Sequence, residues 1–228
     1  MEQLVIAVDV DGTLYDGSGV ATEATDALTS ARDAGHRIVI VTGRRWEQLG
    51  HVVPTILPLC ERAVCEEGTV LVDVSTGHFT LLGPPADVSL VEALSAEGVA
   101  PLDVGHVVIG APSSARAKVD LVLAHIGSKL VITTNKGSIG MMPAGCDKGA
   151  GLTAAIMDLG VPHLRVLAIG DAANDLPMFA VASLPVAVAN ADDAVRASGV
   201  PMTMAASGLG VAEALRSYLP RSATVPCS

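Results

Sequence analysis

Three short apolar runs, each followed at once by polar residues, limit most strongly what this chain can fold into. The runs span residues 4–8, 38–41 and 166–169, and each consists of aliphatic residues alone. Continuous apolar runs of this length are typical of strands that are buried on both faces of a parallel sheet. A helical pattern over residues 22–34 separates the first two runs, which predicts a right-handed β-α-β unit. We therefore expect an α/β protein whose core is a Rossmann-like, doubly wound parallel sheet.

The first run leads directly into Asp9-Val10-Asp11-Gly12. Ligands bind at the strand tips of an open α/β sheet, and alternation along a strand directs Asp9 and Asp11 to the same side. Two carboxylates so close repel each other unless a cation or a proton lies between them. Gly12 permits the sharp reversal of the chain that follows. Taken alone, this segment could also be a solvated acidic turn.

Three further polar segments follow along the chain. They are Thr42-Gly43-Arg44 after the second apolar run, Asp147-Lys148-Gly149 at the start of an expected helix, and the stretch from Gly170 to Asp175 after the third run. Each has a structural alternative when it is taken alone: a strand-to-helix turn, a solvated helix end and a helix N-cap, respectively. Their common position beside buried strands or at a helix start favours a shared ligand site over these alternatives.

In this order, the four segments resemble the four motifs of the haloacid dehalogenase-like (HAD) hydrolase superfamily. The resemblance runs from residue 5 to about residue 179, and it is strongest to the capped, Cof-type branch of sugar-phosphate and phosphoglycolate phosphatases. It implies a phosphoric monoester hydrolase that uses Mg²⁺ and forms an aspartyl-phosphate. By this resemblance, Asp9 is the nucleophile, and Asp11 is the general acid for the leaving group and then the base for water.

The resemblance also implies a metal site and a phosphate site. The Mg²⁺ ligands would be Asp9, Asp171, Asp175 (directly or through a water) and the backbone carbonyl of Asp11. The phosphate-binding groups would be the Thr42 hydroxyl, the Gly43 backbone N–H, Lys148 and Asn174. Arg44 could contact the substrate or form a surface ion pair.

Two breaks in composition divide the chain. Gly83-Pro84-Pro85 and Pro143-Ala144-Gly145 are linker-like, so we expect a catalytic core of residues 1–83 and 145–228. Residues 84–144 carry an α-β-α-β-β pattern and are expected to form an inserted, small α+β cap domain. Caps of this kind exclude water and supply specificity, and the turn Asn135-Lys136-Gly137 is the best candidate for a contact with substrate.

Charge and composition exclude some functions. The 228 residues carry a formal net charge of −10, which argues against binding to nucleic acid or to an anionic membrane surface. No uninterrupted apolar stretch is long enough to span a bilayer, and the four cysteines show no C-x-x-C spacing. We expect reduced thiols, a cytoplasmic location, and a local cation at any site for an anionic substrate.

A small phosphorylated metabolite, such as a sugar phosphate or a phosphoglycolate-like acid, is the expected substrate. A phosphomutase of the same superfamily is an alternative, although it would have to shield the aspartyl-phosphate from water. A receiver-like phospho-acceptor module is an alternative of a different class, because it also combines Asp, Thr, Lys and Mg²⁺. Such modules are roughly half as long, and they lack a second acid two residues after the acceptor.

Overall fold

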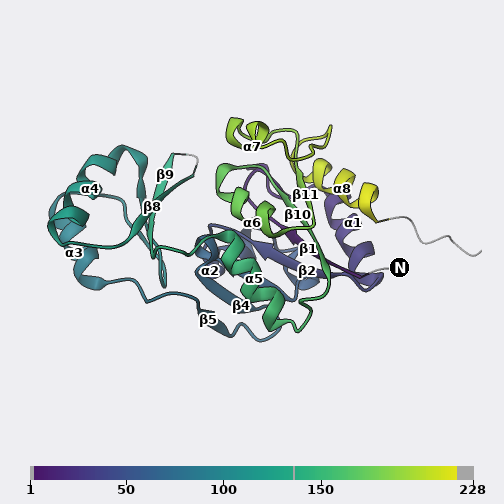
Figure 1. Ribbon diagram of the computed structural model, residues 1–228, viewed down its shortest axis with the longest axis horizontal. Coiled ribbons are helices and arrows are strands. Elements are labelled where there is room, and N and C mark those ends of the chain that lie inside the picture. The colour runs from purple at the N-terminus through teal and green to yellow at the C-terminus, as the bar shows by residue number, and fades with distance from the viewer. Residues whose placement is uncertain (1–2, 136, 220–228) are drawn as a thin grey trace, which may run out of the picture.

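The computed structural model describes residues 3–135 and 137–219. Within them the chain forms two separate sheets, one with strand order β11-β10-β1-β2-β3-β4-β5 and one with order β6-β7-β9-β8. The larger sheet lies among helices, and the smaller sheet lies at one end of the molecule with its own two helices, α3 and α4 (Figure 1).

The larger sheet is parallel over its first five strands in spatial order. The strands β11, β10, β1 and β2 each pair in parallel with the next strand in this order, and β4 and β5 add an antiparallel edge beside β3. The bounds are β1 Leu4–Val8, β2 Arg37–Val41, β3 Arg62–Cys65, β4 Val70–Asp73, β5 Phe79–Leu81, β10 Arg165–Gly170 and β11 Leu184–Ala187. The expected doubly wound sheet is thereby confirmed, and the two predicted strands 4–8 and 37–41 have the predicted bounds.

Helices cover both faces of the sheet at β1, which explains why this central strand is apolar throughout. Ile6 and Val8 of β1 belong to a buried cluster shared with the helices α1 (Thr22–Asp33), α2 (Trp46–Val52) and α8 (Ser207–Tyr218). Val5 and Ala7 belong to a second cluster on the opposite face. The helices of that face are α5 (Lys148–Asp158), α6 (Leu176–Val181) and α7 (Asp193–Ala197). Because side chains alternate along β1, this one strand contributes to the apolar clusters on both faces of the sheet.

The sequence predicts a helix over residues 46–57 with an interruption at Pro54, and the structure contains such a break. The helix α2 ends at Val52, and a short 3₁₀ turn, Leu57–Leu59, follows after Pro54. Proline has no N–H for the helical ladder and clashes with the preceding turn, so it ends the helix at this point.

The smaller sheet and its helices come from the inserted segment. Its elements are α3 (Val88–Ala96), β6 (Asp103–Val104), β7 (Ile109–Pro112), α4 (Arg116–His125), β8 (Val131–Asn135) and β9 (Ser138–Met142). They enclose a third apolar cluster of their own, which includes Leu94, Ile109 and Met141. The predicted α-β-α-β-β order is present. The prediction did not include the two-residue strand β6, and it began the next strand at residue 107, whereas β7 begins at Ile109.

The later start of β7 has a specific cause. The carboxylate of Glu66 accepts hydrogen bonds from the backbone N–H groups of His106 (2.9 Å), Val107 (2.9 Å) and Val108 (3.1 Å). These three donors are therefore unavailable to a strand ladder. Val107 is buried in the main core cluster, and the ring of His106 lies 4.5 Å from that of Phe79 on β5. The loop is thus fastened to the core at a point separate from the two linkers.

No helix among the described residues has both the length and the apolar character needed to cross a membrane.

Candidate active site

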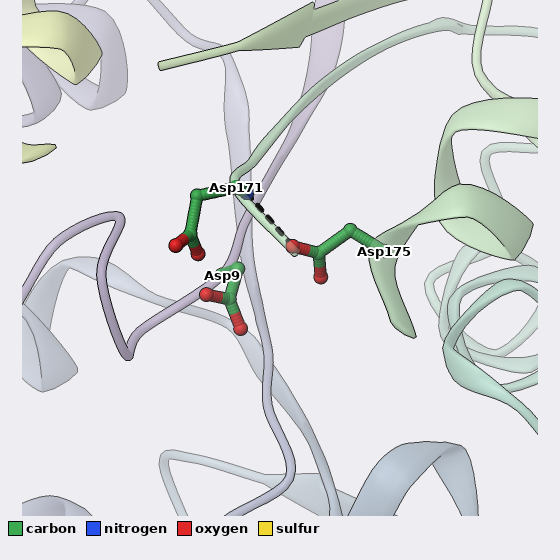
Figure 2. Close-up of side chains that lie close together, drawn as sticks. All are labelled: Asp9, Asp171 and Asp175. Carbon is green, nitrogen blue, oxygen red and sulfur yellow. Dashed lines mark hydrogen bonds between the residues drawn. The ribbon is translucent and has the colours of Figure 1, made fainter. Parts of the chain in front are cut away.

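Three buried carboxylates meet at the carboxyl end of the central strands. Asp9 follows β1, Asp171 follows β10, and Asp175 ends a short 3₁₀ turn that leads into α6. Each offers an oxygen within 4.8 Å of an oxygen of the others, and all three side chains point to a common centre (Figure 2). The strands β1 and β10 are parallel neighbours, and the Asp9 N–H donates to Ile169 O at 2.9 Å. The topology therefore forces these carboxylates together.

The loop from Gly170 to Asp175 folds tightly over its own backbone. The Asp175 Oδ2 atom accepts from the backbone N–H groups of Asp171 (2.9 Å) and Ala172 (3.0 Å). A Cβ atom at Gly170 would lie 2.5 Å from this carboxylate, so only glycine fits there. Asp171 receives a further hydrogen bond from the Thr13 hydroxyl at 3.1 Å.

Lys148 is the buried cation of this centre. Its Nζ atom lies 2.6 Å from Asp9 Oδ1 and 2.6 Å from Asp175 Oδ1, and the side chain is 2% exposed. Burial lowers the pKa of Lys148, but the charges of Asp175 and Asp9 outweigh it and hold that pKa above its usual value. Burial, with the charge of Asp175 as a second cause, raises the pKa of Asp9 well above its usual range, despite Lys148.

The donor set suits a hard divalent cation. Three buried carboxylates share one ammonium group, so the centre carries an excess of negative charge that burial makes costly. Carboxylate oxygens are the ligands that Mg²⁺ prefers, and a cation between Asp9, Asp171 and Asp175 would balance this charge. The residues therefore fit the metal that the sequence predicts.

Asp11 faces a different partner. Both of its oxygens are held by Arg44, with Nε to Oδ2 at 2.7 Å and Nη2 to Oδ1 at 2.6 Å. The guanidinium carbon of Arg44 lies 5.8 Å from the centre of the Tyr15 ring, and the hydrogen bond to Asp11 raises the pKa of Arg44. Thr42 is fully buried behind this pair, and its hydroxyl oxygen accepts from Arg44 N at 3.1 Å.

Two acidic residues that the sequence prediction missed complete the site. Glu66 and Glu67 follow β3 and have positive φ angles of 49° and 56°, which is rare for residues other than glycine. Glu67 accepts from Asn174 Nδ2 on both oxygens, at 3.1 and 3.0 Å, and a Cβ at Gly43 would lie 2.3 Å from its Oε1. The signal was present, because these acids also follow an apolar strand directly.

The predicted role of Asn174 meets a constraint in this geometry. Its amide donors are committed to Glu67, and its Oδ1 atom is buried without a hydrogen-bond partner among the described residues. The atom left over is thus an acceptor, whereas a phosphoryl oxygen needs a donor. Phosphate binding by Asn174 stays a prediction that requires Glu67 to release it.

A cavity of about 650 Å³ opens between the strand tips and the smaller sheet. Asp11, Gly43 and Arg44 line it from the core, and Gly110, Thr133 and Ser138 are among the residues that line it from the smaller sheet. The turn that was predicted to contact substrate reaches this cavity through Gly137. Lys136 and the side chain of Asn135 lie outside the described residues.

Fold and site together define an α/β enzyme with a carboxylate-rich centre at the tips of parallel strands, covered by an inserted α+β unit. The sequence profile of the haloacid dehalogenase-like hydrolases matches residues 6–82 and 111–215. The chain belongs to this family.

Known relatives agree over nearly the whole length. The chain is 28% identical to a phosphoglycolate phosphatase of Nitrosopumilus maritimus, covering 96% of this chain and 98% of that one. It is 31% identical to a phosphoglycolate phosphatase of Pyrobaculum neutrophilum, covering 97% and 98%. A crystal structure of a haloacid dehalogenase-like hydrolase from Bacteroides thetaiotaomicron has the same fold, with a TM-score of 0.80, 17% identity, and coverage of 95% and 99%.

Proposed function

We propose that this protein is a Mg²⁺-dependent phosphatase that hydrolyses a small phosphorylated metabolite through an aspartyl-phosphate. The observation that supports this most directly is the contact between Lys148 and Asp9 beside Asp171 and Asp175. The names of the relatives favour phosphoglycolate or a similar acid as the substrate. Sugar phosphates remain within the proposal, because the cavity is larger than phosphoglycolate requires.

Asp9 acts as the nucleophile in this proposal. One of its oxygens attacks phosphorus, the P–O bond to the leaving group breaks, and an acyl phosphate forms on Asp9. Lys148 holds Asp9 in place and offsets charge that develops during transfer. Asp9, Asp171, Asp175 and the Asp11 backbone carbonyl would hold Mg²⁺, which would neutralise charge on the phosphoryl oxygens. The Thr42 hydroxyl and the Gly43 N–H donate to those oxygens.

Asp11 acts on the other side of phosphorus. It gives a proton to the departing oxygen in the first step and takes a proton from water in the second, so that phosphate leaves Asp9. Arg44 orients the Asp11 carboxylate through hydrogen bonds to both of its oxygens, so the proposal requires Arg44 to release one oxygen when Asp11 carries the proton.

Residues 84–144 act as a cap domain over residues 1–83 and 145–228. Their sheet lines the cavity opposite Asp11, a position from which it can exclude water and contact the part of the substrate beyond the phosphate.

Rapid-quench kinetics with p-nitrophenyl phosphate and intact mass spectrometry test the two carboxylate roles. Asp9→Asn should form no phosphoenzyme. Asp11→Asn should give a burst of nitrophenol, then slow turnover with phosphate trapped on Asp9, because this leaving group needs little protonation. A burst from Asp9→Asn would overturn the nucleophile assignment.

Metal dependence is tested separately with EDTA. Chelation should abolish turnover, Mg²⁺ should restore it, and Ca²⁺ should restore it poorly because its coordination shell is larger and looser. Full activity after exhaustive chelation would contradict the metal site.

A further inference from the structure

Arg45 is a second arginine in the cavity, next in sequence to the arginine that holds Asp11. It precedes α2, its side chain is 35% exposed, and it lines the cavity together with Asp11 and Gly43. Arg44 and Arg45 are the cationic side chains among the described residues that line this cavity. An anionic group of a substrate beyond its phosphate would therefore meet these two side chains on the core side of the cavity.

The two arginines differ in how fully they are engaged. Arg44 is held by two short hydrogen bonds to Asp11, so its fork is occupied. Arg45 has an ion pair with Asp103, in which Nε lies 3.1 Å from Oδ1. The direction of this contact does not make a hydrogen bond, and the buried Nε atom has no hydrogen-bond partner among the described residues. A buried donor left without a hydrogen bond is costly, and a well-aligned carboxylate would satisfy it.

Asp103 is a replaceable partner. Its side chain is 59% exposed and belongs to β6, an edge strand of two residues in the smaller sheet. An exposed carboxylate in an imperfect ion pair contributes little stability, so another carboxylate can take its place at small cost. Pro101, Leu102 and Val108 also line the cavity and carry no charge. The carboxylates of Glu66 and Glu67 line it too, but they accept hydrogen bonds from other parts of the chain.

We propose that Arg45 binds the carboxylate of a phosphorylated acid by displacing Asp103, and that it thereby selects phosphorylated acids over neutral phosphate esters. This inference rests on the proposed phosphatase function and adds a specificity residue to it. The substrate class is a short phosphate monoester with a carboxylate at its other end.

Matched pairs of substrates isolate the effect of the substrate's carboxylate on kcat/KM. Phosphoglycolate is compared with 2-hydroxyethyl phosphate, and 3-phosphoglycerate with glycerol 3-phosphate, because each pair differs only by a carboxylate in place of a hydroxymethyl group. For the protein itself, kcat/KM should be higher for the acid in at least one pair. Arg45→Gln should lower the acid-to-neutral ratio by about 10- to 100-fold, the range expected for a hydrogen bond between charged groups. Arg45→Lys should restore part of the ratio.

Asp103→Asn should act in the opposite direction. It removes the competing carboxylate, so the KM for the acid should fall by about 3- to 10-fold while the KM for the neutral partner stays in place. If the Arg45–Asp103 pair had a purely structural role, both substitutions would lower kcat/KM for the acid and for the neutral ester alike. Arg116→Gln is the matched control, because Arg116 pairs with Asp120 on the surface of α4 and should leave the ratio unchanged.

Calorimetric binding of the same compounds to Asp9→Asn, with and without Arg45→Gln, keeps this proposal distinct from the proposed function. If the protein binds acids more tightly than neutral esters, loses this preference in Arg45→Gln, and does not turn the compounds over, the proposed phosphatase function is wrong and the proposed role of Arg45 is supported. The proposed role of Arg45 is wrong if Arg45→Gln turns substrates over with an unchanged acid-to-neutral ratio of kcat/KM. It is also wrong if Asp103→Asn has a higher KM for the acid. Neither outcome would contradict the phosphatase function.

Discussion

Arg44 and Asp11 lie face to face, with two parallel hydrogen bonds of 2.7 and 2.6 Å between the guanidinium fork and the carboxylate. Asp11 comes just after β1 and Arg44 just after β2, so the pair bridges the tips of two adjacent parallel strands. Asp11 is not one of the three clustered carboxylates and lines the cavity, where a leaving group would lie.

Removal of this bridge should impair the acid step. Arg44→Gln leaves Asp11 in place but without its fixed direction, so we expect kcat for an alkyl phosphate to fall by about 10- to 100-fold, which is less than the loss of roughly 10²–10⁴-fold expected when a general acid is removed. The loss should be smaller for p-nitrophenyl phosphate, which needs little help from an acid. Arg37→Gln is the control, since Arg37 forms a similar pair with Glu61 at the far end of β2. Equal losses for both substrates would contradict this role.

Lys148→Met should destabilise the metal-free protein strongly. It leaves Asp9, Asp171 and Asp175 without their buried cation, and loss of one partner from a buried ion pair costs about 3–5 kcal/mol. Mg²⁺ should restore more stability to this variant than to the parent, because it neutralises the same carboxylates. Urea unfolding with and without Mg²⁺ measures this, and Lys118→Met, at an exposed position on α4, provides the comparison. An equal effect of Mg²⁺ on both proteins would argue against a shared centre.

Magnesium affinity should rise with pH. Burial and the charge of Asp175 raise the pKa of Asp9 above its usual 3.8 in the metal-free state, so Mg²⁺ must displace a proton in part of the population. In the same state, the protonated form of Asp9 favours folding below its unfolded pKa, and this contribution disappears as the pH rises through the folded pKa. Calorimetry in buffers of different ionisation enthalpy should detect proton release on binding, and Asp9→Asn should release less. Affinity that does not change as the pH rises from the usual pKa of Asp9, 3.8, to neutrality would refute the shift.

Glu66→Ala should loosen the loop between β6 and β7. It removes the acceptor of three backbone N–H groups, and we expect the free energy of unfolding to fall by about 2–4 kcal/mol. Amide exchange at residues 106–108 should accelerate far more than in the core strands, which mass spectrometry can resolve. Glu97→Ala, at an exposed residue just after α3, should change neither quantity. Unchanged protection at residues 106–108 would show that the carboxylate is dispensable.

The central strands of the larger sheet could be predicted from the local sequence. The runs that became β1 and β2 are apolar because both faces of the sheet are covered, so their bounds could be predicted to the residue. Parallel strands end at the same edge, so the positions of Asp9 and Asp171 in the sequence also indicated that they would meet.

Contacts between distant side chains were beyond prediction. Nothing in the order of residues says that Arg44 holds Asp11, because that depends on two rotamers and on the spacing of β1 and β2. The loop that Glu66 holds could not be predicted for the same reason. Val107 and Val108 have the composition of a strand, yet a carboxylate some 40 residues away takes their N–H groups from the ladder.

Glu66 and Glu67 are consecutive and line the same cavity, yet they hold two different parts of the chain. One carboxylate holds the loop from His106 to Val108, and the other holds Asn174 beside the buried carboxylates. Both residues sit in a left-handed backbone conformation, so the peptide between them has little freedom to absorb a strain on either side. Through this one peptide unit, the loop of the inserted unit is therefore joined to Asn174 beside the buried carboxylates. A displacement of the inserted unit would reach Asn174 by this route, and the short turn would couple the two parts of the proposed active site.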